Sequence, residues 1–181
     1  LVAFGLGMRL EGNLYRPVGE GPFPAVLVVS EIWGVHEHIR DVARRFAKLG
    51  YFAIAPELFA RQGDAGKVTD VQALIRDIVA KTPDAEVMAD LDATVAFAKA
   101  SGKADTSRLG ITGFCWGGRT TLMYAAHNAG VKAAVPWYGP VARNYHPGDK
   151  TALDVAPQIK AAVLGLYGGD DPGIPNDTVE K

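Results

Sequence analysis

Short runs that are apolar on both faces alternate along this chain with longer stretches of helical periodicity. The run Ala25-Val-Leu-Val-Val-Ser30 is rich in β-branched residues and shows no polar alternation, which is typical of a strand buried in a parallel sheet. In residues 37–49, Ile39, Val42 and Phe46 recur at spacings of three and four, which predicts one apolar helix face. The alternation predicts an α/β fold with a mostly parallel central sheet and helices on both faces.

The same patterns place the remaining elements. Further strands are expected at residues 51–55, 108–112, 131–136 and 161–167, and further helices at 67–81, 84–101 and 116–128. Apolar residues make up 48% of the 181-residue chain, which is enough for one ordinary core. We therefore expect residues 1–181 to form a single domain.

Charge and composition narrow the classes of partner. The net charge of −1 gives no basis for binding nucleic acid or an anionic membrane, and we find no apolar run of about 18 residues that would span a bilayer. The single cysteine excludes an internal disulfide and suits a cytoplasmic location. We expect a small-molecule substrate, no cofactor and no metal. We also expect a monomer, although the sequence does not determine the oligomeric state.

The most informative segment is Gly113-Phe-Cys115-Trp-Gly117-Gly118, which lies directly between an expected strand and an expected helix. A nucleophile flanked by small residues at this junction is the pattern of a nucleophile elbow, here with cysteine in the usual serine position. The helix N-terminus favours a thiolate, and the N–H of Trp116 is the expected first oxyanion donor. A lone cysteine can also be simply a buried packing residue, but its context favours the elbow.

From about Pro24 onward the chain resembles the dienelactone hydrolase family (carboxymethylenebutenolidases) of the α/β-hydrolase superfamily. Four segments in the family's order carry the resemblance: Ser30-Glu31-Ile-Trp-Gly-Val35, Pro56-Glu-Leu-Phe-Ala-Arg61-Gln62, the elbow at Gly113–Gly118, and Leu166-Tyr-Gly-Gly-Asp-Asp171-Pro-Gly-Ile-Pro175. The resemblance implies the α/β-hydrolase fold and the hydrolysis of an enol-lactone through a cysteine nucleophile and a thioester intermediate, as in aromatic catabolism.

The resemblance also implies roles for three residues at the centre of the reaction. Cys115 would attack the lactone carbonyl, Asp171 would orient the catalytic histidine, and Glu31 would lie beside the sulfur and control its protonation. Other interpretations remain for two of them: Glu31 could cap the helix that begins near Glu37, and Asp171, like its neighbour Asp170, could be a turn former.

Two further roles follow from the same resemblance. The N–H of Ile32 would be the second oxyanion donor beside that of Trp116. Arg61 would pair with a substrate carboxylate, for which its planar guanidinium is suited. Arg61 could instead be a solvated loop charge.

The chain order of such a hydrolase predicts a histidine after the acid, and none follows Asp171. The four histidines are His36, His38, His127 and His146, of which His146 is a weak candidate for the base. We expect the histidine beyond residue 181, and the domain to be C-terminally incomplete, without its last strand and helix.

Two other functions remain open from the sequence. The same fold hosts broader carboxylesterase and thioesterase activities. A non-catalytic or redox-sensing protein could use Cys115 as its reactive thiol.

Overall fold

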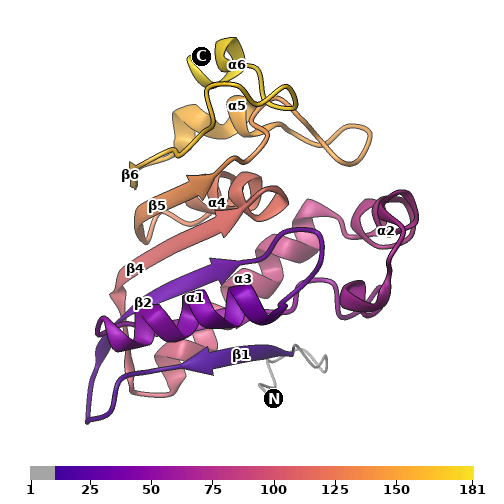
Figure 1. The fold of residues 1–181 in the computed structure, drawn as a ribbon. Helices are drawn as coiled ribbons and strands as arrows, with labels where there is room; N and C mark the ends of the chain where they lie inside the picture. The colour runs from indigo at the N-terminus through magenta and orange to yellow at the C-terminus, as the bar shows by residue number, and fades with distance from the viewer. Residues whose placement is uncertain (1–10) are drawn as a thin grey trace.

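The computed structural model describes residues 11–181, in which six strands form one twisted sheet (Figure 1). The strands are β1 (Gly12–Tyr15), β2 (Phe23–Val29), β3 (Phe52–Pro56), β4 (Ala104–Phe114), β5 (Val131–Trp137) and β6 (Ala162–Val163). Their order across the sheet is β1-β3-β2-β4-β5-β6. The pairing of β1 with β3 is antiparallel, and the pairings from β3 through β6 are parallel.

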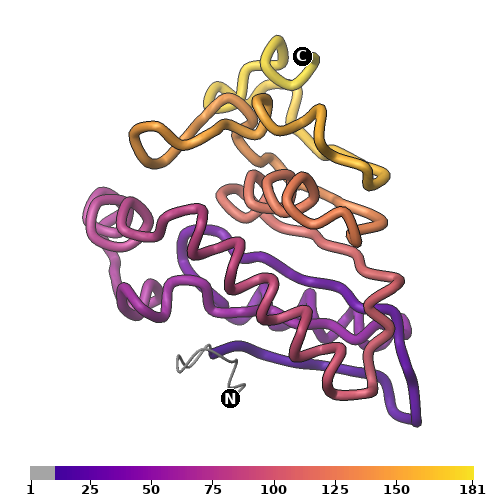
Figure 2. Tube along the Cα trace, turned by 180° about the vertical axis from the view of Figure 1, so that it is seen from behind, coloured from indigo at the N-terminus to yellow at the C-terminus, as the bar shows by residue number. Residues whose placement is uncertain are grey.

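Helices cover both faces of this sheet. They are α1 (Glu37–Lys48), α2 (Val71–Asp77), α3 (Asp84–Ala100), α4 (Trp116–His127), α5 (Ala152–Val155) and α6 (Asn176–Val179), with 3₁₀ turns at Ala65–Lys67, Val79–Lys81 and Ala156–Gln158. Helix α1 crosses the front of the sheet in Figure 1, whereas α3 and α4 lie behind it and come forward in the opposite view of Figure 2. The predicted α/β architecture, mostly parallel with helices on both faces, is confirmed.

The central strand β2 shows why the sequence lacks polar alternation there. Val26 and Val28 pack in the cluster that includes Ile39 of α1, whereas Leu27 and Val29 belong to the larger cluster on the other face. All four side chains are buried, and burial of each contributes about 1.5–3 kcal/mol. A strand with a helix layer on either side is therefore apolar at every position.

Several elements differ from the sequence prediction, which did not include the short helices α5 and α6. The helix expected over residues 67–81 is divided, because Asp70 caps a new start at α2 by accepting from the N–H of Ala73 at 2.6 Å. The strand expected at residues 161–167 shortens to Ala162–Val163 plus a bridge from Leu166 to Trp137. Strand β1 was not predicted at all, because its four residues carry no clear apolar pattern.

The parallel strands bring several loops to one edge of the sheet. Strands β2, β3, β4 and β5 end at Val29, Pro56, Phe114 and Trp137, so the loops that follow them start close together. No helix among residues 11–181 is long and apolar enough to cross a membrane. The candidate site lies at this carboxyl edge.

Candidate active site

Cys115 lies in the tight turn that joins β4 to α4. Its backbone has φ 53° and ψ −116°, a conformation rarely adopted by a residue with a side chain. Such strain persists only where the surrounding structure enforces it, and here the Cys115 N–H donates to the Trp137 carbonyl at 3.0 Å. The sequence prediction that Cys115 stands at a strand-to-helix turn is confirmed.

Two glycines after Cys115 allow the neighbouring strands to close around the turn. A Cβ on Gly117 would collide with the backbone carbonyls of Val29 and Ser30, at the end of β2. A Cβ on Gly118 would lie 2.6 Å from the Trp137 carbonyl oxygen, at the end of β5. The first turn of α4 is thus wedged between β2 and β5, with backbone against backbone, and only glycine fits there.

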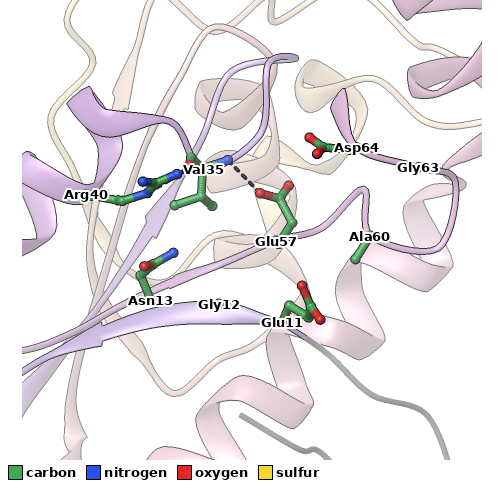
Figure 3. A pocket seen from close by; sticks show the side chains of 9 residues that line it. All are labelled: Glu11, Gly12, Asn13, Val35, Arg40, Glu57, Ala60, Gly63 and Asp64. Atoms are coloured by element: carbon green, nitrogen blue, oxygen red, sulfur yellow. Dashed lines mark hydrogen bonds between the residues drawn. The ribbon is translucent and has the colours of Figure 1, made fainter. Parts of the chain in front are cut away.

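The loop after β2 carries Glu31 and Ile32 and is anchored from β3. Glu57, which follows β3, accepts a hydrogen bond from the Val35 N–H at 2.8 Å (Figure 3). It lines a cavity of about 530 Å³ that also contains Asp64 and Arg40. Burial, more than any neighbouring charge, raises the pKa of Glu57. This carboxylate was not predicted from the sequence, although it lies in the segment Pro56–Gln62 that carried the resemblance.

Glu31 itself contacts a histidine. Its Oε2 lies 2.9 Å from His36 Nε2, and the Glu31 side chain is 16% exposed. The N-cap residue of α1 is His36, and no side chain caps that helix. The alternative interpretation of Glu31 as a helix cap is therefore wrong.

The thiol of Cys115 has a pKa above its ordinary value. Burial is the largest cause, and the negative charges of Glu31 and Asp171 act in the same direction. A hydrogen bond from the Trp116 N–H and the positive charge of Arg143 oppose them. The expected effect of the helix N-terminus is thus present but outweighed, so the resting group at neutral pH is the thiol.

The two predicted oxyanion donors are the backbone N–H groups of Trp116 and Ile32. The Trp116 N–H lowers the pKa of the Cys115 thiol, as just described, and the Trp116 indole is buried against Phe59 at a ring distance of 4.7 Å. Ile32 follows Ser30 by two residues, and the Ser30 carbonyl touches the elbow at Gly117. Both roles stay predictions.

Two tyrosines complete the surroundings of Cys115 and were missed from the sequence. Tyr138 follows β5 directly with φ 38°, and its pKa is raised by burial and then by the charges of Glu31 and Cys115. Tyr145 is half-buried, and burial followed by the charge of Cys115 raises its pKa. An aromatic residue at the carboxyl end of a strand was the one available signal, and it was present only for Tyr138.

Asp171 lies in the loop that follows β6. Its Oδ1 accepts from the Gly173 N–H at 2.8 Å, an Asx turn, so the turn-forming interpretation holds as a structural fact. Its charge also acts on the Cys115 thiol, which puts the carboxylate near the site. An Asx turn occupies one carboxylate oxygen and leaves the other available to orient a base.

Arg61 is engaged elsewhere in the fold. Both terminal nitrogens of its guanidinium donate to the carboxylate of Asp90 in α3, whose side chain is only 7% exposed. The alternative of a solvated loop charge is therefore wrong. That Arg61 binds a substrate carboxylate stays a prediction, and this two-pronged ion pair would compete with it.

The four histidines have other neighbours. His36 binds Glu31, His127 binds Asp92 at 2.8 Å, and His146 Nδ1 lies 2.9 Å from Asp149. His38 packs edge-on against Phe114. Within residues 11–181 no histidine hydrogen-bonds to Cys115 or Asp171, and no cluster of side chains in that part of the chain could hold a metal.

Comparison with known proteins identifies the relationship. The sequence profile of the Dienelactone hydrolase family matches residues 10–181. The chain belongs to this family. A protein of Methylorubrum extorquens is 61% identical over 171 residues, and one of Escherichia coli K12 is 52% identical over 167 residues; both are named "Putative carboxymethylenebutenolidase". These alignments cover 91% and 89% of this chain.

A solved structure agrees with the sequence relatives. The crystal structure of a protein from Klebsiella pneumoniae, named "Putative Dienelactone Hydrolase", superposes with a TM-score of 0.92 at 51% identity. The superposition covers 97% of this chain and 73% of the Klebsiella pneumoniae chain. The chain spans 57% and 59% of the two curated relatives it matches. The fold is that of the α/β-hydrolases, as predicted.

Proposed function

We propose that the protein hydrolyses an enol-lactone of the dienelactone type (a carboxymethylenebutenolide) with Cys115 as the nucleophile. The observation that carries the proposal is the elbow: a cysteine at φ 53°, followed directly by the backbone N–H of Trp116 at the start of α4, in a chain of the dienelactone hydrolase family. This arrangement presents a nucleophile and an oxyanion donor at the same point.

The proposed reaction has two steps. The Cys115 thiol gives its proton to Glu31 as substrate binds, the sulfur attacks the lactone carbonyl, and the ring C–O bond breaks to leave a thioester and an enolate, which takes up a proton. Water activated by a histidine then cleaves the thioester, which releases the carboxylate and restores the thiol. Glu31 is the proposed group that accepts the thiol proton, and Asp171 is the proposed partner of the base histidine.

The raised pKa of Cys115 favours this function over a redox sensor. A sensor thiol is accessible and ionised at rest, because the thiolate is the species that oxidants attack. In this structure burial and two carboxylates oppose ionisation. A thiol that is quiet until substrate arrives suits an enzyme better.

The decisive experiment is Cys115→Ala in the complete protein, assayed on a dienelactone by the loss of its absorbance. We expect turnover to fall by at least about 10³-fold, because the nucleophile is removed, while the thermal unfolding curve verifies that the variant folds. Turnover retained at the wild-type rate would refute the cysteine mechanism. Neutral aryl esters assayed in parallel distinguish a lactone hydrolase from a broader carboxylesterase or thioesterase.

A further inference from the structure

The loop of residues 30–35, between β2 and α1, carries Glu31 and Ile32. At the start of this loop, the Ser30 carbonyl lies so close to the elbow that a Cβ on Gly117 would come within 2.4 Å of its oxygen. Ser30 itself is buried. The first residue of the loop is therefore held against the turn that carries the nucleophile.

The other end of this loop is held at Val35. The Val35 N–H donates to Glu57 Oε2 at 2.8 Å, and the Val35 carbonyl accepts from two nitrogens of Arg40 at 3.1 and 2.9 Å. Both side chains reach Val35 from the cavity of about 530 Å³ that Figure 3 shows. Val35 is buried, which strengthens such hydrogen bonds because little water competes for them. Ile32 lies between the two held ends.

The Glu57 carboxyl lies closer to this loop than a side chain at position 34 would allow. Gly34 has φ 73°, and a Cβ there would come within 2.7 Å of Glu57 Oε1. Oε1 is buried and has no hydrogen-bond partner within residues 11–181. An unpaired buried oxygen destabilises a fold. One half of this carboxyl is therefore a cost to stability, and the other half holds Val35.

The charged side chains that line the cavity with Glu57 are Glu11, Asp64 and Arg40. Burial raises the pKa of Glu57, the charge of Asp64 acts in the same direction, and the charge of Arg40 opposes them. Arg40 directs its hydrogen bonds to the Val35 carbonyl. The raised pKa favours the uncharged acid, in which Oε2 accepts from the Val35 N–H as an amide oxygen would.

We propose that Glu57 is a positioning residue for the oxyanion site: through Val35 it fixes the loop of residues 30–35 and thereby the direction of the Ile32 N–H. An oxyanion donor stabilises the transition state only when it is already aimed at the developing charge. A misplacement of about 1 Å can cost about 10²-fold in rate. This inference rests on the proposed function, because the Ile32 N–H is an oxyanion donor only in a hydrolase of this kind.

Two uncharged replacements of similar length separate the hydrogen bond of Glu57 from the size of its side chain. Glu57→Gln keeps an oxygen that accepts from the Val35 N–H, whereas Glu57→Met has none. In the complete protein we expect kcat for a dienelactone to fall about 10- to 100-fold in Glu57→Met, with KM within about threefold of the wild type. In Glu57→Gln kcat should stay within about threefold of the wild type. Thermal unfolding curves verify that both variants fold.

Alkylation of Cys115 by iodoacetamide separates Ile32 from Glu31, the other proposed group on the loop. In this reaction an S–C bond forms as iodide leaves, and no oxyanion develops. The rate should change by less than about twofold in Glu57→Met, because the thiol keeps its surroundings. A rate that falls or rises as much as kcat would mean that Glu57 acts through Glu31, and would overturn the assignment to the oxyanion donor.

Hydrogen exchange of the Val35 amide, followed by NMR, tests the loop without turnover. Exchange should become at least about tenfold faster in Glu57→Met and change by less than about threefold in Glu57→Gln. Asp64→Asn is the matched control, because it removes a carboxylate from the same cavity and its amide oxygen can still accept from the Gly66 N–H, as Asp64 does. Exchange unchanged in Glu57→Met, or equally accelerated in Asp64→Asn, would overturn the proposal.

The results distinguish this inference from the proposed function. If Cys115→Ala retains turnover, the proposed function fails and the catalytic part of the inference fails with it, whereas Val35 exchange still decides whether Glu57 holds the loop. If Cys115→Ala abolishes turnover but Glu57→Met keeps kcat within about threefold of the wild type, the function stands and the positioning role of Glu57 is wrong.

Discussion

The elbow and the acid loop carry the two proposed catalytic groups, but they are built differently. Cys115 lies in a turn held by backbone contacts to β2 and β5, with Gly117 and Gly118 pressed against carbonyl groups. Asp171 lies in a mostly exposed loop, where its own Asx turn with Gly173 and one bond from Asn176 to Gly169 provide the order. The nucleophile is fixed by tertiary packing, whereas the acid is fixed by local hydrogen bonds.

The difference indicates how each group should respond to substitution. A residue wedged between strands cannot change without moving the sheet, so sequence changes there act on folding. A residue held by its own turn can change its chemistry while the fold stays intact. Substitutions in the acid loop should therefore change activity without changing stability, whereas substitutions at the elbow should change both.

The largest effect is expected for Asp171→Asn on activity. Asparagine keeps the Asx turn, because its amide oxygen still accepts from the Gly173 N–H, but it cannot stabilise a histidinium. Turnover of a dienelactone should fall about 10²–10⁴-fold, with the free energy of unfolding changed by less than about 0.5 kcal/mol. The matched control is Asp170→Asn at the exposed neighbour. A larger loss in Asp170→Asn than in Asp171→Asn would reverse the assignment.

A smaller but clear effect is expected for Gly117→Ala on stability. The new Cβ would collide with the Val29 and Ser30 carbonyls. Because these carbonyls belong to the backbone and cannot move aside, we expect the free energy of unfolding to fall by about 3 kcal/mol. Gly169→Ala in the acid loop is the control, since a Cβ there meets nothing within 4 Å. Urea unfolding of both variants measures the contrast, and equal stabilities would contradict the wedge.

The smallest effect is expected for Glu31→Gln on thiol reactivity. Loss of this negative charge should lower the Cys115 pKa, because Glu31 raises it in the wild type, and a lower pKa leaves more thiolate at neutral pH. Alkylation by iodoacetamide at about pH 7 should become several-fold faster. In both proteins the rate should rise with pH. Glu37→Gln, at an exposed carboxylate paired with Arg44, is the matched control, and a similar acceleration there would contradict the local effect.

Much of the fold could be predicted, for a physical reason. Continuous apolar runs such as residues 25–30 predict strands buried on both faces, and the structure confirms this with two clusters on opposite sides of β2. The elbow could also be predicted, because its glycines and its place between two elements are local signals. Strand β1 could not, because its pairing with β3 depends on a neighbour about 40 residues away.

The candidate site could be predicted only in part. Cys115, Glu31 and Asp171 came from motifs, and the structure places their charges within reach of one another. Tyr145 left no signal, because its place near Cys115 comes from contacts between segments far apart in the chain. Where an arginine donates its hydrogen bonds depends on which carboxylate the fold brings to it.

By itself, the amino-acid sequence determined the α/β alternation, the strained turn at Cys115 and the family, because apolar periodicity and small residues at a junction act over a few positions. Only the tertiary structure decided which partner each charged side chain has. It paired Arg61 with Asp90, buried Arg119 on Asp84 and left Arg143 exposed over the Tyr145 ring. These outcomes differ because an ion pair forms wherever packing brings opposite charges together at low exposure, and no local pattern in the chain encodes that distance.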